Sequence, residues 1–210
     1  MKKAFLDLDG TLVDSKKRHV EVLRDVLSEY GLRCSRMDDY IEKKTQGFST
    51  KWYLENCLKL DIDLSDKINK KWIAIIEEER YLQLDSWYDD SLGFLLFLKK
   101  SGYENIIVSA RNNEAYARRY IQKSIQNQYI DDVFFVPSIN AIDNKVKVIR
   151  DNIEENSIII GDTEMDYESA TIVGIDYFIL NRGFRSKLYW ENKSIVSYDN
   201  LTMIKSKMLN

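Results

Sequence analysis

The pattern of apolar and polar positions divides the chain into three parts. Near the N-terminus a short apolar run, residues 4–6, predicts a buried strand. From residue 15 to about residue 85, apolar residues recur at helical spacing and no stretch has the composition typical of a strand. From about residue 87 onward, short apolar runs alternate with helical segments. That order is typical of βαβ units.

The middle part is predicted to be helical throughout. Its first helix carries an apolar stripe and ends at Gly31, the residue type that commonly follows a helix; the stripe consists of Val20, Leu23, Leu27 and Tyr30. Further helices are expected at residues 37–44 and 50–58, and in a longer segment with Ile68, Trp72, Ile75 and Leu82 on one side. Residues 15–85 are therefore expected to form an all-helical insert, a cap domain.

The third part predicts a parallel sheet. Strands are expected at residues 105–108, 132–136, 157–160 and 177–180, with an edge strand at 194–196 before a terminal helix. Helices are expected between them: 89–101, closed by Gly102, then 112–124, one from about Asn144, and one through Ala170 and Val173. The fold class is therefore α/β, a three-layer Rossmann-like parallel sheet core formed by residues 1–14 and 86–210.

Two carboxylates follow the first strand. Asp7 and Asp9 are two positions apart, so their side chains project toward the same side, and Gly10 allows a sharp turn directly after them. Two like charges at this spacing cost several kcal/mol unless a cation lies between them or one carboxyl holds a proton. The motif therefore indicates a metal site.

The other strand ends supply further polar groups. Ser109 follows the strand at 105–108, and Asp162 and Asp166 follow the strand at 157–160. Lys145 and Lys147 both lie near the start of a predicted helix, and their side chains point to different sides of it, so only one of them can face the strand ends. Since active sites of parallel sheets gather at the carboxyl ends of the strands, these groups are expected together. Several carboxylates are the hard oxygen ligands that Mg²⁺ prefers.

Composition narrows the function classes. With 31 basic and 34 acidic residues the net charge is -3, so no bulk positive field exists to hold nucleic acid or an anionic membrane. The apolar run after Lys2 and Lys3 is broken at Asp7, and no run reaches the ~20 residues of a membrane helix. A cytoplasmic location is expected. Cys34 and Cys57 lack metal-type spacing and are expected to be buried or idle thiols, with a disulfide between them as the less favoured alternative.

Taken together, these motifs resemble the haloacid dehalogenase superfamily. The match consists of Asp7-x-Asp9-Gly10-Thr11, Ser109, Lys145 and the sequence from Gly161 to Asp166, in the family's order. The resemblance implies Asp7 as nucleophile and Asp9 as acid/base. It implies a phosphate site from Ser109, Lys145 and the amides near Gly10 and Thr11. It also implies Mg²⁺ held by Asp7, the backbone carbonyl of Asp9 and Asp162, with Asp166 orienting metal-bound water.

The activity that the resemblance implies is Mg²⁺-dependent hydrolysis of a small phosphorylated metabolite through an aspartyl-phosphate. Asp9 disfavours dehalogenation, because the family's dehalogenases lack this second aspartate. A phosphomutase of the β-phosphoglucomutase type is an alternative, since His19 lies twelve residues after Asp7 as a cap-hinge histidine does there. Arg111-Asn112 and Thr11 disfavour it. A non-catalytic binding or regulatory module is the other alternative.

The substrate-contacting residues stay open at this point. Gly47 lies in a loop flanked by Lys43, Lys44 and Lys51, which is either a specificity loop or an ordinary solvated surface. Arg111 either reaches the substrate or contacts solvent, and His19 is either a hinge residue or an ordinary surface residue. This sequence departs from the family's pattern at two places. It has Asp89-Asp90 where the family often has Pro-Gly, and Val146 where the family often has Pro, and these differences affect the motif of Lys145 most. The natural substrate and the oligomeric state do not follow from the sequence.

Overall fold

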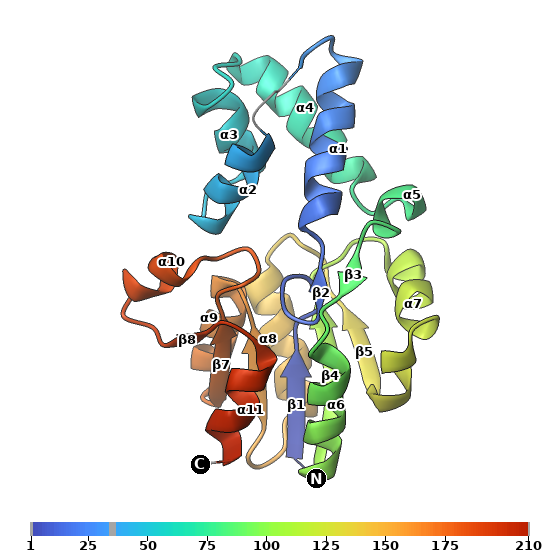
Figure 1. The fold of residues 1–210 in the computed structure, drawn as a ribbon, viewed down its shortest axis with the longest axis vertical. Helices are drawn as coiled ribbons and strands as arrows, with labels where there is room; N and C mark the ends of the chain where they lie inside the picture. Colours follow the sequence, from blue (N-terminus) through green and yellow to red (C-terminus); the bar gives the residue numbers. More distant parts are fainter. Residues whose placement is uncertain (1, 34–36, 210) are drawn as a thin grey trace.

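A single parallel sheet forms the base of the molecule in the computed structural model, which describes residues 2–33 and 37–209 (Figure 1). The strand order is β5-β4-β1-β6-β7-β8, and every pair in this sheet is parallel. The strands are β1 (Lys2–Leu6), β4 (Tyr103–Ser109), β5 (Asp132–Phe135), β6 (Ile158–Gly161), β7 (Asp176–Leu180) and β8 (Ser197–Tyr198). The strand with the first acidic motif thus lies in the middle of the sheet.

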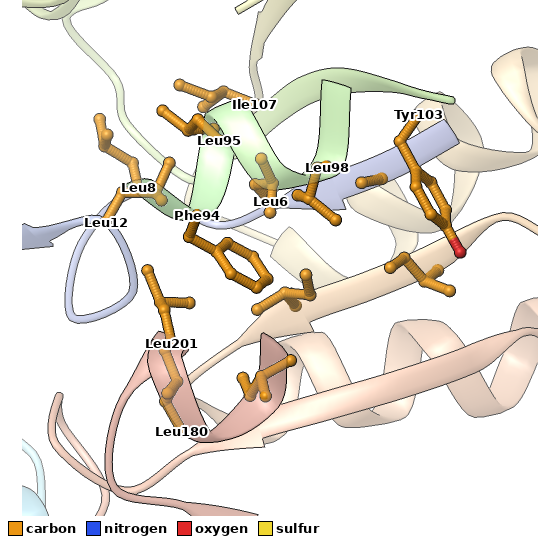
Figure 2. Close-up of a cluster of buried hydrophobic side chains, with 14 of the residues drawn as sticks. Leu6, Leu8, Leu12, Phe94, Leu95, Leu98, Tyr103, Ile107, Leu180 and Leu201 are labelled. Atoms are coloured by element: carbon orange, nitrogen blue, oxygen red, sulfur yellow. The ribbon is translucent and has the colours of Figure 1, made fainter. Parts of the chain in front are cut away.

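The central strand β1 is buried on both faces, as its continuous apolar sequence requires. Ala4 and Leu6 join one hydrophobic cluster, and Phe5, which points to the opposite face, joins another. Figure 2 shows the first cluster, where Phe94 and Leu95 of one helix and Leu201 of another pack near Leu6. Each face of the sheet is therefore covered by its own layer of helices.

The helices around the sheet alternate with its strands. They are α6 (Ser91–Lys100), α7 (Glu114–Gln122), the 3-10 helix η1 (Ile125–Tyr129), α8 (Ala141–Asn152), α9 (Glu164–Val173), α10 (Lys187–Glu191) and α11 (Leu201–Leu209). The face shared with Leu6 is covered by α6 and α11, and the opposite face by α8 and α9. This is the three-layer α/β architecture that the sequence predicts.

Within the described residues, helices α1 to α5 form the insert above the sheet (Figure 1). They are α1 (Lys16–Glu29), α2 (Met37–Thr45), α3 (Thr50–Asn56), α4 (Ile62–Ile75) and α5 (Glu79–Leu82). The chain enters through β2 (Val13–Asp14) and leaves through β3 (Ser86–Trp87), which pair antiparallel. The insert has a hydrophobic cluster of its own, including Leu23, Tyr40 and Ile68. The predicted boundary at residues 15–85 as a separate domain stays a proposal.

Most predicted elements are confirmed, and the differences have local causes. The segment expected as one long helix is two, α4 and α5, because Glu78 between them has an extended backbone with φ -67° and ψ 146°. The predicted edge strand at 194–196 was wrong by a few residues. Ser194 has a positive φ of 56° in a turn, and β8 begins only afterwards. The pattern also missed α10, which is too short to show helical periodicity.

The structure describes one of the two cysteines. Cys57 is an exposed free thiol, whereas Cys34 lies outside the described residues. Within the described ranges, no helix has both the length and the apolar character needed to cross a bilayer.

Candidate active site

The loop after β1 places the first acidic motif at the carboxyl edge of the sheet. The Asp7 amide donates to the Ile160 carbonyl of β6 at 2.9 Å, so β6 holds Asp7 beside its own end. Gly10 then turns the chain with φ +82°, and its amide donates to the Val13 carbonyl at 2.7 Å. The turn returns the chain to the sheet edge and fixes both aspartates there.

Three carboxylates meet at this edge. Asp7, Asp162 and Asp166 each offer one oxygen, and these oxygens lie within 4.8 Å of one another. Backbone approaches Asp162 so closely that a Cβ on Gly10 or Gly183 would collide with its carboxylate. Such a cradle of hard oxygen donors fits a divalent cation, Mg²⁺ foremost. The side chain of Asp9, which the sequence grouped with these residues, is not part of this cluster and binds Arg18 and Arg111 instead.

Lys145 is the cation inside this cluster. Its Nζ donates to Asp7 Oδ1 at 2.7 Å and to Asp166 Oδ1 at 2.6 Å. The other Asp166 oxygen accepts from the Thr163 amide and hydroxyl in a capping box that starts α9. Both oxygens of Asp166 are therefore occupied, one by Lys145 and the other by the start of α9.

One lysine does not neutralise three buried carboxylates. Burial raises the pKa of Asp7 to about 7, with Lys145 lowering it and Asp166 raising it. Burial, together with the charges of Asp7 and Asp166, also raises the pKa of Asp162 well above its ordinary value. The excess negative charge is what a bound divalent cation would neutralise.

Asp9 belongs to a second charged cluster. Arg111 binds it through two bonds, from Nε to Oδ2 at 2.8 Å and from Nη2 to Oδ1 at 2.7 Å. Arg18 of α1 donates to Asp9 Oδ1 at 2.5 Å and to Asp85 Oδ1 at 2.9 Å, and Arg111 also reaches Asp85 at 3.1 Å. The four side chains form a neutral quartet where the insert joins the sheet. We refer to it as the hinge quartet.

The arginines of the hinge quartet keep Asp9 ionised. Burial alone would raise the pKa of Asp9, but the guanidinium groups of Arg111 and Arg18 outweigh it and hold that pKa well below its usual range. Burial raises the pKa of Asp85 to about 6 against the lowering by Arg18. As placed, Asp9 is an ionised carboxylate whose two oxygens are occupied. To exchange a proton, as the sequence predicts for it, Asp9 must first leave at least one arginine.

A cavity of about 360 Å³ opens between the insert and the sheet. Asp7, Asp9 and the buried Ser109 line its floor, so the two aspartates and the hydroxyl face one space. The Thr11 hydroxyl donates to Asp162 Oδ1 at 3.4 Å, and a phosphate contact from the amides near Gly10 and Thr11 stays a prediction. Gly10 likewise faces Asp162.

The residues predicted with the insert lie in different places. His19 lines the cavity, with its ring 5.2 Å from that of Trp72 and 4.5 Å from that of Phe184. Arg111 also lines it but is only 3% exposed, so it is not a solvent contact. Gly47 packs against the Tyr189 ring of α10 and is not among the residues that line this cavity.

Sequence reasoning missed two members of the hinge quartet. Arg18 directly precedes His19, and Asp85 stands at the other end of the insert. A charged residue on each connection into a predicted insert was the available signal. Only the folded chain brings the two connections together, through the pairing of β2 and β3.

A parallel sheet with a buried acidic cluster at its carboxyl edge and a helical insert over it defines a class of hydrolases. The family model of haloacid dehalogenase-like hydrolases matches residues 4–180 of this chain. The chain belongs to that family, and the sequence-based identification is confirmed. The match runs through β1, the whole insert and β7.

Solved structures share the fold over the whole chain. A predicted phosphatase from Clostridium acetobutylicum is 18% identical, with a TM-score of 0.75 and coverage of 99% of this chain and 98% of that one. A haloacid dehalogenase-like hydrolase from Streptococcus pneumoniae is 18% identical, with a TM-score of 0.77 and the same coverage. A predicted phosphoglycolate phosphatase from Haemophilus somnus is 15% identical, with a TM-score of 0.74 and coverage of 100% and 98%. No curated protein matches the chain significantly.

Proposed function

We propose that this protein is a Mg²⁺-dependent phosphatase that hydrolyses a small phosphorylated molecule through a phosphoryl group carried on Asp7. The observation that carries the proposal is the acidic cluster of Asp7, Asp162 and Asp166 around Lys145, beside a cavity that Asp7 and Ser109 line together. The family membership and the similarity to solved structures of predicted phosphatases support the same reaction.

In this proposal the chain's own groups divide the work. Asp7 attacks phosphorus, and splitting the displacement in two lowers each barrier. Ser109 and Lys145 hold the phosphoryl oxygens, and Asp166 fixes the Lys145 ammonium in place. Asp7 and Asp162 would hold Mg²⁺, with the Asp9 carbonyl predicted as a third ligand. When bound, the ion cancels repulsion between the nucleophile and the phosphate.

Proton transfer falls to Asp9 after a rearrangement. Its carboxylate lies at the cavity but is held by Arg18 and Arg111, so the acid/base role requires release from the hinge quartet. Because Arg18 belongs to the insert, whereas Asp9 and Arg111 both follow strands of the sheet, a movement of the insert as a cap would change the contact between Arg18 and Asp9. Such a cap would also exclude water during phosphoryl transfer. A cytoplasmic location and the absence of nucleic-acid binding remain predictions from composition.

Release of phosphate from an aryl phosphate tests the function. We expect turnover that requires Mg²⁺ and that falls at least about a thousandfold in Asp7→Asn. The matched control is Asp151→Asn, which makes the same change at an exposed position on α8 and should retain full activity. An unchanged rate in Asp7→Asn would remove Asp7 from its role. Isomerisation of a sugar phosphate in the presence of its bisphosphate would instead favour a phosphomutase.

A further inference from the structure

The walls of the active-site cavity are apolar above its charged floor. Residues of the insert and of the sheet edge contribute to them: Trp72, Ile73, Ile76, Ala110, Met165 and Phe184. Ile73 is 48% exposed although it lines the cavity, so a large apolar side chain stands open at this place. Apolar surface of this kind binds apolar groups of a ligand.

The charged side chains that line the cavity are already paired within the protein. Arg18 and Arg111 share Asp9 and Asp85 in the neutral hinge quartet. Glu77 accepts hydrogen bonds from the amides of Asn112, at 3.0 Å, and Asn113. Among the described residues that line the cavity, the charges of Arg18 and Arg111 are therefore already matched by those of Asp9 and Asp85, so a second anionic group of a substrate would bring an unmatched negative charge.

Lys44 is a further cation near this place, but it does not line the cavity. Its Nζ lies 5.2 Å from the Trp72 ring centroid and 5.9 Å from that of Phe184, and it is 3.4 Å from Thr50 Oγ1. The two rings line the cavity themselves, so the lining at this place is aromatic.

Two polar atoms at the cavity residues lack partners. Arg111 Nη1 and His19 Nδ1 are both buried and have no hydrogen-bond partner within the described part of the chain. Burial, with the charges of Lys44 and Arg18, lowers the pKa of His19, so the imidazole is neutral. A neutral oxygen or nitrogen on a ligand would satisfy either atom without adding a buried charge.

We infer that the organic part of the substrate is an uncharged, ring-bearing apolar group, so that the enzyme prefers neutral aryl-type phosphates to phosphates carrying a second anionic group. This inference rests on the proposed phosphatase function and adds the substrate class to it. The apolar walls bind the ring, and an additional carboxylate would enter a space whose lining cations, Arg18 and Arg111, are already matched by carboxylates. Burial of such an unpaired charge is costly.

Four aryl phosphates of similar leaving-group acidity test the inference. Phenyl and 2-naphthyl phosphate differ by one apolar ring, and 4-carbamoylphenyl and 4-carboxyphenyl phosphate differ mainly in charge. We expect kcat/KM to be about tenfold higher for the naphthyl than for the phenyl ester, mostly through KM, because about two more methylene equivalents are buried. We expect the carboxyphenyl ester to be at least about tenfold poorer than the carbamoyl ester.

A matched pair of variants tests whether the cavity wall causes the discrimination against the carboxyphenyl ester. Ile73→Arg adds the missing cation to the wall and should abolish or reverse the discrimination against the carboxyphenyl ester. Ile172→Arg is the control, because Ile172 has the same 48% exposure but lies on α9 and does not line the cavity. It should keep both wild-type ratios.

The outcomes separate the two claims. Asp7-dependent hydrolysis in which the carboxyphenyl ester is used as well as or better than the carbamoyl ester overturns the inference and leaves the phosphatase standing. Equal use of the phenyl and naphthyl esters also overturns it, since the walls then do not contact the organic group. Absence of Asp7-dependent hydrolysis for all four esters rejects the phosphatase and the inference together.

Discussion

Replacement of Asp7 by asparagine should stabilise the metal-free protein at alkaline pH. In the folded chain Asp7 lies with two other carboxylates and one lysine, and burial raises its pKa from 3.8 to about 7. A carboxyl whose pKa is raised by folding binds more protons in the folded state between these two values. Stability therefore falls as pH rises through this window, and the full cost is present above about pH 7.

The size of the effect follows from the same interval. Between pH 5 and pH 7 the free energy of unfolding falls by roughly 1.4 kcal/mol per pH unit. Asp7 alone should therefore lower it by roughly 3 kcal/mol on going from pH 5 to pH 8. Asparagine resembles the protonated carboxyl in shape and carries no charge. At pH 5 the variant should therefore match the wild type, and at pH 8 it should be the more stable protein.

Urea unfolding in EDTA at the two pH values measures this difference. The raised pKa of Asp85 acts on both proteins alike, because the charge of Asp7 is not among its causes. The pKa of Asp162 is raised partly by the charge of Asp7, so the substitution lowers that cost as well and adds to the stability of the variant at pH 8. Addition of Mg²⁺ at pH 8 should stabilise the wild type, by about 2.7 kcal/mol at a hundred times its dissociation constant, and the variant much less. Identical pH dependence in the two proteins would refute the reasoning.

Two further substitutions test the two clusters. Arg111→Met should lower the free energy of unfolding by about 3 kcal/mol in urea titration, because it leaves Asp9 and Asp85 sharing one guanidinium. Arg118→Met, at an exposed ion pair, should change it by less than about 1 kcal/mol, and equal effects would argue against the hinge quartet. Gly183→Ala should displace Asp162 and weaken Mg²⁺ binding measured by calorimetry. Gly93→Ala, where a Cβ meets open space in α6, should leave Mg²⁺ affinity unchanged.

The acidic motifs were predictable because their chemistry conflicts with their surroundings in the sequence. A carboxylate directly after a buried strand is unfavourable unless it has a partner, so Asp7 and Asp162 stand out from the local pattern alone. Parallel topology then implies that both strand ends share one edge. In the folded chain β1 and β6 are neighbours, and these two carboxylates meet Asp166.

The partner of Asp9 was not predictable in this way. Asp9 follows the same strand as Asp7, yet its side chain binds Arg18 and Arg111, which are 9 and 102 positions away. Nothing in the local pattern distinguishes a buried arginine from a solvated one. The choice depends on where the insert sits over the sheet, and only the tertiary packing of the chain sets that position.

By itself, the sequence determined the α/β class, the helical insert, the family and the acidic strand ends, because each of these is written in local periodicity or in a short motif. Only the tertiary structure decided which carboxylate faces a lysine and which faces two arginines, and that the cavity above them has apolar walls. Those outcomes depend on contacts between residues far apart in the chain, and their energies arise from burial, which exists only once the chain is folded.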